Sequence, residues 1–405
     1  MGVARAACLE GTPMRVRRRL LVSVVPLLAV VALGVAPAPA QAAATTGPSV
    51  AYQLNAKHDG YSADTRLVTP LAKRWSRDLP GFSSYPLIAQ GRVYVTAADH
   101  DAGGDYGSTL YALDEATGAT VWSREIGGRY YWSNAALDAG RVFVVNYDGL
   151  LTALDAGTGA LIWSTQLTGQ HAFSGPPTAA GGTVYLGGAG SGGTLYAVRE
   201  TDGAVRWTQT VANGDASSPA LSATTVFVTY ACGLVYAFDR VTGAPTWYNG
   251  GRCEGFGGST PVLHNGRVYS RDPIDGNETI NATTGATVGT FQADPAPAFA
   301  GSTGVFLHAG VLRATSGSSP LWSFTGDGGL VTAPIIVGDT VYAGSSTGRV
   351  YGLALATGKQ RWTALTGAPI YAPYDGSASA PLTGLGAGDG LLVVPAGHRL
   401  VAYAP

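Results

Sequence analysis

The sequence predicts an all-β fold: an eight-bladed β-propeller of four-stranded blades, closed by pairing of the N- and C-terminal strands. Three observations support this prediction. A hairpin motif returns along the chain, a strand–turn–strand motif lies between its copies, and each chain end carries half of one hairpin. The composition agrees, because 58 glycines, 23 prolines and only 13% charged residues suit many short strands and turns.

The recurring hairpin is clearest between Leu110 and Trp122. A run of strand-forming residues ends at Asp114, whose side chain can cap a turn. Gly118, in the Thr-Gly pair that follows, is free to adopt a positive φ. A second strand then ends in tryptophan, and the other strong copies end at Trp163, Trp207, Trp247 and Trp362.

Weaker copies fill the gaps in this series. One copy has Gly289 in place of the tryptophan, and we expect Phe291, two residues on and therefore on the same strand face, to fill that space. A shortened copy runs from Ala314 to Trp322. The units are spaced about 33 to 47 residues apart, which is the period of a four-stranded propeller blade.

The two chain ends supply the eighth unit between them. Trp75 ends a second strand that has no first strand before it, and residues 399–404 form a first strand with no second after it. We therefore expect residues 71–79 to pair with residues 400–404, because each would otherwise leave an open sheet edge.

The strand–turn–strand motif supplies the other two strands of each blade. It recurs between the hairpins, at residues 86–95, 135–144, 219–228 and 334–342. Four strands in each of eight units make a closed ring, which is how a propeller protects its edges.

The amino terminus has the features of a secretion signal. Arginines 15 and 17–19 precede an apolar run from Leu20 to Val35, and Ala40-Gln41-Ala42 offers a cleavage site. We expect residues 1–42 to be removed, with Met14 as an alternative start and the twin-arginine route as an alternative to general export. An uncleaved anchor is the other alternative, although the run is shorter than the roughly 20 residues that a span requires.

These features predict an exported, extracellular bacterial protein without a stable membrane anchor, which we expect to be monomeric. Residues 43–70 form an N-terminal extension that should lie across the propeller, and residues 71–405 form the propeller. His58 and Asp59 in the extension are expected to form a surface turn, since no second pair of metal ligands follows at a fixed spacing. A formal net charge of −1 argues against nucleic acid as a partner.

The repeat of strand, Ala-x-Asp-x-x-Thr-Gly, strand and Trp resembles that of the PQQ-type propellers. That family includes quinoprotein alcohol dehydrogenases and the non-catalytic outer-membrane assembly factor of the β-barrel machinery, and the resemblance spans residues 71–405. It implies that the repeated tryptophans dock between neighbouring blades and are structural. They are Trp75, Trp122, Trp163, Trp207, Trp247, Trp322 and Trp362.

The resemblance also implies what a catalytic member would contain. Such a quinoprotein is longer and places PQQ against a disulfide between adjacent cysteines, with Ca²⁺ and an Asp base nearby. This chain has no adjacent cysteines and no Cys-x-x-Cys-His haem attachment. We therefore expect a non-catalytic binding or scaffold protein without a cofactor or metal; the alternative is a PQQ-dependent dehydrogenase or a sugar-processing enzyme.

The connections between successive blades are rich in aromatic and ionisable residues. In a propeller these connections converge on one face around the axis, where rings beside polar groups suit a protein or carbohydrate ligand. Trp132 lies outside the tryptophan series and is expected to be free for a ligand; the alternative for all these rings is packing between blades. The candidates are Tyr130, Tyr131, Trp132, His171, Phe173, Asp215, Phe256, Tyr371 and Tyr374.

Two cysteines, Cys232 and Cys253, remain once the leader is removed. Each lies in a loop after a strand, and because strands alternate in direction within a blade, both loops emerge on the same face. Export to an oxidising compartment favours a disulfide that closes a loop of about 20 residues and stabilises by roughly 3 kcal/mol. Two free thiols are the alternative.

Overall fold

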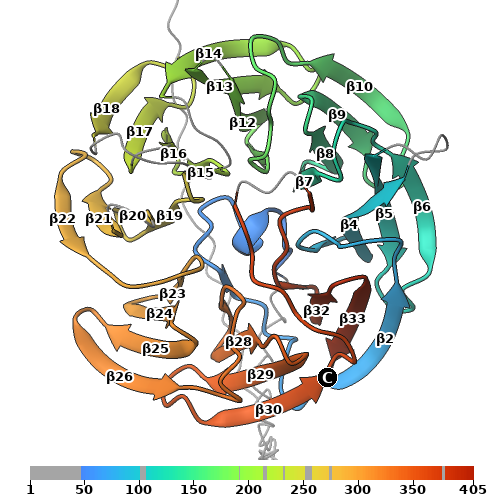
Figure 1. The fold of residues 1–405 in the computed structure, drawn as a ribbon, viewed down its shortest axis with the longest axis vertical. Helices are drawn as coiled ribbons and strands as arrows, with labels where there is room; N and C mark the ends of the chain where they lie inside the picture. Colours follow the sequence, from blue (N-terminus) through green and yellow to red (C-terminus); the bar gives the residue numbers. More distant parts are fainter. Residues whose placement is uncertain are drawn as a thin grey trace, which may run out of the picture. The chain divides into compact units, whose positions relative to one another are not determined.

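The computed structural model describes residues 47–100, 106–190, 192–212, 217–230, 233–250, 258–272, 276–375 and 379–405. Within the compact unit Ala44–Pro405, eight antiparallel β-sheets stand side by side around a central axis (Figure 1). The prediction of an eight-bladed propeller is confirmed. Within these residues, no helix is both long and apolar enough to cross a membrane.

We number the blades along the chain, each from its inner to its outer strand. Blade 1 contains β3 (Leu87–Ala89), β4 (Arg92–His100), β5 (Tyr106–Asp114) and β6 (Thr120–Glu125). Blade 2 contains β7 (Ser133–Asp138), β8 (Arg141–Asn146), β9 (Leu150–Asp155) and β10 (Leu161–Gln166). Blade 3 contains β11 (Thr178–Ala180), β12 (Thr183–Gly190), β13 (Gly192–Arg199) and β14 (Val205–Val211). Blade 4 contains β15 (Ala220–Leu221), β16 (Thr225–Tyr230), β17 (Leu234–Asp239) and β18 (Pro245–Asn249).

The second half of the ring repeats this order. Blade 5 contains β19 (Val262–His264), β20 (Arg267–Ser270), β21 (Glu278–Asn281) and β22 (Thr287–Thr290). Blade 6 contains β23 (Ala298–Ala300), β24 (Thr303–His308), β25 (Val311–Ser316) and β26 (Ser319–Phe324). Blade 7 contains β27 (Ile335–Val337), β28 (Thr340–Gly344), β29 (Arg349–Ala354) and β30 (Gln360–Leu365). Blade 8 contains β31 (Gly386–Gly388), β32 (Leu391–Ala396), β33 (Arg399–Ala404) and, as its outer strand, β2 (Ala72–Asp78).

The ring closes in blade 8 as the sequence predicts. β2 pairs antiparallel with β33, with Trp75 opposite Ala402 and Asp78 opposite Arg399. The C-terminal part of the chain therefore supplies three strands of this blade and β2 supplies the fourth, and Figure 1 shows β2 beside the C-terminus.

The repeated tryptophans join seven of the eight blades to the next, as the resemblance implies. The ring of Trp75 lies against Gly118 of blade 1, where a Cβ would stand 2.7 Å from the indole. Gly118 also has a φ of 71°, so both its conformation and its lack of a side chain are required. Every one of these indoles donates its N–H to a backbone carbonyl of the next blade: Trp75 to Glu115, Trp122 to Ala156, Trp163 to Glu200, Trp207 to Arg240, Trp247 to Ala282, Trp322 to Leu355 and Trp362 to Leu71.

The contact between blades 5 and 6 has no tryptophan. Phe291 takes its place, because its ring lies edge-on to Tyr269, 5.4 Å away, and 6.0 Å from Phe306 of blade 6. The turn of blade 6 that would cover an indole is the shortened copy, and a Cβ at its Gly317 would meet nothing within 4 Å. The two departures from the repeat are thus one structural feature: no indole is present where the turn is too short to cover it.

The segment ahead of β2 runs along the inside of the ring. The short 3₁₀-helix η1 (Tyr52–Leu54) lies at the centre of Figure 1, and β1 (Tyr61–Ser62) pairs in parallel with β27 of blade 7. The expectation that His58 and Asp59 form a surface turn is wrong. Both residues are buried, because their backbone and side chains contact the inner strands of several blades.

The alternating strand directions give the ring two different faces. One face, here called the loop face, carries the connections between blades and the loops between second and third strands. The other, here called the turn face, carries the Thr-Gly turns. The candidate ligand residues that the structure describes belong to connections on the loop face.

Candidate functional site on the loop face and the ring axis

A long connection between β30 and β31, residues 366–385, crosses the ring at the loop face. It starts at blade 7, yet its Asp375 reaches blade 5, and the carbonyl of its Leu382 accepts a hydrogen bond from the Tyr85 N–H ahead of blade 1. A single loop therefore contacts blades that lie on different sides of the axis.

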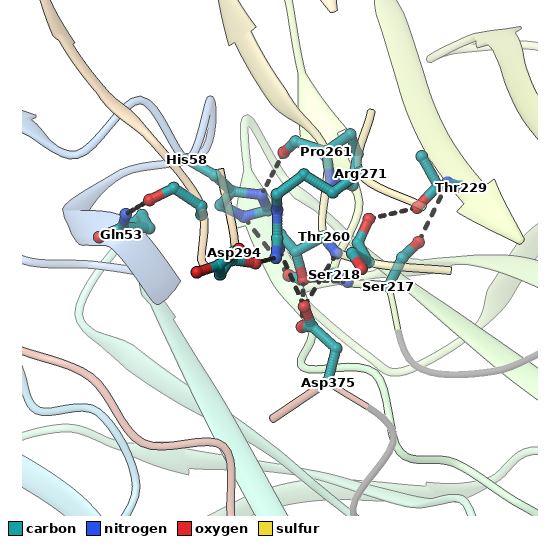
Figure 2. Close-up of polar contacts among 12 residues, drawn as sticks. Gln53, His58, Ser217, Ser218, Thr229, Thr260, Pro261, Arg271, Asp294 and Asp375 are labelled. Atoms are coloured by element: carbon teal, nitrogen blue, oxygen red, sulfur yellow. Dashed lines mark hydrogen bonds and ion pairs between the residues drawn. The ribbon is translucent and has the colours of Figure 1, made fainter. Parts of the chain in front are cut away.

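Asp375 is held by a nearly buried ion pair (Figure 2). An Arg271 guanidinium nitrogen lies 3.0 Å from one carboxylate oxygen, and the Thr260 hydroxyl donates to the other at 2.9 Å. Arg271 also donates to the carbonyl of Asp294 at 2.7 Å. Arg271 and Asp375 thus neutralise each other, and a buried pair of this kind is costly to break on one side.

His58, which Figure 2 also shows, bridges three blades. Its Nδ1 is 3.3 Å from the carbonyl oxygen of Pro261, and its Nε2 is 3.2 Å from the Thr178 hydroxyl and 3.4 Å from the Ser218 hydroxyl. A carbonyl only accepts, so Nδ1 carries the proton and Nε2 accepts from the hydroxyls. Burial lowers the pKa of His58 to about 4, against the hydrogen bond to Pro261 and the charge of Asp59.

The contact between Ser218 and His58 does not form a nucleophilic site. Ser218 is fully buried, so no substrate reaches its hydroxyl. The second imidazole nitrogen faces a carbonyl rather than a carboxylate that could stabilise an imidazolium. The hydrogen bonds of His58 hold the N-terminal segment against blades 3, 4 and 5.

We predict that His58 makes the protein less stable in acid. Its pKa is about 4 in the folded chain and about 6.5 when unfolded, so its contribution is fully present above pH 6.5 and is lost as the pH falls towards 4. Between pH 7 and pH 4 the wild type should lose about 3 kcal/mol more unfolding free energy than His58→Gln. Denaturant titrations of both proteins at each pH measure this difference, and equal losses would refute the assignment.

The axis itself is filled by the chain's own residues. Gln53 of η1 donates through its side-chain amide to the carbonyls of Ala296 and Pro334, at 3.2 and 3.3 Å. The ring of Tyr52 lies 5.4 Å from that of Tyr85, and burial raises its pKa, with a further contribution from Asp375. Below the crossing loop, η1 therefore packs against blades 1, 6 and 7.

Several of the predicted ligand residues are exposed on the loop face, held in edge-to-face ring pairs. Tyr130 packs against Tyr147 at 4.6 Å, and Tyr131 packs against Tyr106 at 4.8 Å. The backbone carbonyl of exposed His171 accepts a hydrogen bond from Arg129, which is also paired with Asp148. Blades 1 to 3 thus present paired tyrosine rings beside the Arg129–Asp148 ion pair.

The crossing loop brings a second group of rings to this face. Tyr371 packs edge-on against Phe82, 5.0 Å away, and Phe82 in turn packs against His398. Tyr374 is 72% exposed, against 46% for Tyr371 and 43% for Tyr130. Phe82, Tyr106 and Tyr147 were not identified from the sequence, although Phe82 lies in a connection equivalent to those that were.

Two of the sequence predictions at this face are wrong. Trp132 is only 1% exposed and Phe173 is fully buried; both belong to the core between blades 2 and 3. Trp132 directly precedes β7, so its side chain is carried into the space between the blades. The ring of Phe173 lies against Gly149, and a Cβ at position 149 would overlap this ring. Neither ring is available to a ligand.

Four further candidates cannot be placed. Asp215, Phe256, Cys232 and Cys253 lie outside the described residues. The disulfide and the ligand roles of Asp215 and Phe256 stay predictions.

A separate cavity of about 490 Å³ lies on the turn face, between blades 8 and 1. In blade 8 the paired strands β33 and β2 are far apart in the sequence, so no Thr-Gly turn joins them as it does in the other blades. The cavity lies at this position. Arg66 in its wall pairs with Asp389, and burial, followed by the charge of Asp389, raises the pKa of Glu115 to about 7. Its charges are mixed in sign and mostly paired, so the cavity favours no single class of ligand.

Comparison with known proteins identifies similar sequences and folds. The family model described as outer membrane protein assembly factor BamB matches residues 106–209, 191–368 and 308–405. No curated protein matches this chain by sequence.

Three solved structures illustrate the similarity of fold. BamB from Moraxella catarrhalis is 19% identical, with a TM-score of 0.63, over 83% of this chain and 100% of that one. Quinohemoprotein alcohol dehydrogenase from Comamonas testosteroni is 14% identical, with a TM-score of 0.66, over 88% and 80%. A europium-containing methanol dehydrogenase is 13% identical, with a TM-score of 0.66, over 89% and 98%. At these identities the comparisons show a common fold and do not distinguish binding from catalysis.

Proposed function

This chain belongs to the PQQ-like propeller family described as outer membrane protein assembly factor BamB, and on that premise we propose that it is an exported, non-catalytic protein that binds a protein partner through its loop face. The observation that carries the proposal is the set of exposed tyrosines on this face.

The exposed rings have the properties of a protein interface. Tyrosine is enriched at the centres of interfaces, where it offers a large contact area and a polar end. Tyr130 and Tyr371 are fixed by neighbouring rings before any partner arrives. Little side-chain freedom is then lost on binding, which favours affinity.

The charges of the loop face also suit a protein rather than an ionic ligand. Arg129 is paired with Asp148, His308 with Asp294, and Arg271 with Asp375. Contacts through rings and hydrogen bonds are therefore the main interactions that the described part of this face offers.

The residues at the axis do not fit PQQ with Ca²⁺, which supports a non-catalytic role. The sequence contains no adjacent cysteines, and the described residues include no group of three or more His, Cys, Asp or Glu side chains suited to a metal. Tyr52 and Gln53 fill the axis, and Arg271 is already paired with Asp375. We therefore derive no catalytic step through a quinone.

The proposal predicts that a partner contacts Tyr374 and not the outer rim. A photo-crosslinking residue at position 374 should capture one protein from culture medium or cell wall. The same residue at position 248, a tyrosine that is 70% exposed on the outer strand β18, is the matched control. Tyr371→Ala, combined with the crosslinker at 374, should reduce the yield at least about tenfold, as expected for an interface anchor. Equal capture at positions 374 and 248 would refute the loop-face assignment.

A further inference from the structure

The N-terminal segment makes one full circuit of the inside of the ring. It meets the blades in chain order: Ser49 bonds to blade 1, and Asp64 and Arg66 bond to residues of blade 8. Its carbonyls accept hydrogen bonds of 2.7–2.9 Å from the inner strands of six blades. The donor and acceptor pairs are Ile88 to Ser49, Leu137 to Val50, Leu221 to Ala56, Leu263 to Lys57, Phe299 to Asp59 and Ile336 to Gly60.

The six donors occupy the same place in their blades. Each is the last or second-to-last residue of an inner strand, next to the turn, and its N–H points towards the axis. An inner strand is the edge of its sheet, and such N–H groups require partners when they are buried. The inner edges of the ring thus form a set of equivalent binding positions for peptide carbonyls.

The segment has a backbone conformation that it would not hold alone. Gln53, Leu54 and His58 have φ values of 52°, 71° and 57°. Positive φ costs a non-glycine residue roughly 1 kcal/mol or more, so the surrounding ring must impose these angles. In the same way, a peptide bound to a receptor takes a backbone conformation that its contacts with the receptor stabilise.

Three side-chain positions fix the register of the segment. Gln53 donates to carbonyls of blades 6 and 7, and His58 bridges blades 3, 4 and 5. Gly60 has a φ of 65°, and a Cβ there would stand 2.9 Å from the Cβ of Ala298. The side chain of Lys57, by contrast, is exposed, and this residue bonds to blade 5 through its carbonyl.

We propose that the ring axis is a peptide-binding site and that residues 47–62 are its resident ligand, bound within the same chain. The site recognises an extended peptide by its main-chain carbonyls, with Gln53, His58 and Gly60 setting the register. The inference is independent of the proposed function, which concerns the loop face.

A nicked protein tests this proposal in the full chain. A site for a sequence-specific protease is inserted after Val68, which is exposed, and the folded protein is cut there. The fragment ending at residue 68 should stay with the ring in gel filtration, and the melting temperature of the cut protein should rise with its concentration. A fragment that separates from a ring that remains folded, with an unchanged melting temperature, would overturn the proposal.

Peptide exchange then tests which residues are recognised. A labelled peptide of residues 47–62 should replace the cut fragment and should restore any stability lost with it. Gly60→Ala and His58→Ala in the peptide should each weaken binding at least about tenfold, because each disturbs a buried contact. Lys57→Ala, the matched control, should leave binding within about threefold. Equal binding of all four peptides, or no binding of the unmodified one, would overturn the proposal.

Discussion

Replacing residues 71–79 with a glycine–serine linker of the same length is expected to abolish cooperative folding or to lower the melting temperature by more than about 10 °C. The change removes the outer strand of blade 8, which pairs with β33 along its length. It also removes the indole of Trp75, which bonds to blade 1, and the buried side chain of Leu71, which belongs to the same core cluster as Trp362 of blade 7. Three contacts that hold the ring closed are lost together.

A double variant of the same strand serves as the control. Lys73→Ala with Arg74→Ala removes two exposed side chains and leaves the backbone pairing of β2 intact. Exposed substitutions usually change stability by less than about 0.5 kcal/mol each, so this protein should melt close to the wild type. If the linker variant also melted within a few degrees of the wild type, ring closure by β2 would not be what stabilises the propeller.

Trp163→Ala and Trp132→Ala are each expected to cost about 3–5 kcal/mol of unfolding free energy. Both side chains are buried in the core between blades 2 and 3, and Trp163 also donates its indole N–H to the carbonyl of Glu200 at 2.8 Å. Tyr374→Ala, which truncates an exposed ring, should change stability by less than about 0.5 kcal/mol. Denaturant titrations of the three variants measure these values.

The result at Trp132 distinguishes two interpretations of the loop face. A cost of several kcal/mol is expected if this ring is part of the core, as its burial indicates. A near-neutral Trp132→Ala would instead place the ring at the surface, where the sequence alone suggested that it was free for a ligand.

The blades could be predicted from the sequence because each is built from local signals. The Asp-x-x-Thr-Gly turn and the tryptophan that follows it lie within one hairpin, and the same pattern recurs in the other blades. Ring closure could be predicted because residues 71–79 and 399–404 are the two halves of one hairpin. The packing of Phe291 could be predicted because it lies on the same strand face as the missing tryptophan. These features depend on periodicity, which is present in a single sequence.

The sequence did not reveal contacts between distant parts of the chain. Arg271 and Asp375 are separated by 104 residues, and no motif relates them. His58 is buried by blades that begin more than one hundred residues later, so its own neighbours suggested a turn. Trp132 shows the same limit, because the burial of a loop ring is decided by the two blades on either side of it.

The central claim, that this propeller is a binding protein and not a quinone enzyme, is tested most directly by titrating the purified protein with PQQ and Ca²⁺. We expect no saturable quinone absorbance and no reduction of an electron-accepting dye when alcohols or sugars are added. Saturable quinone absorbance together with dye reduction by an alcohol or a sugar would contradict the claim.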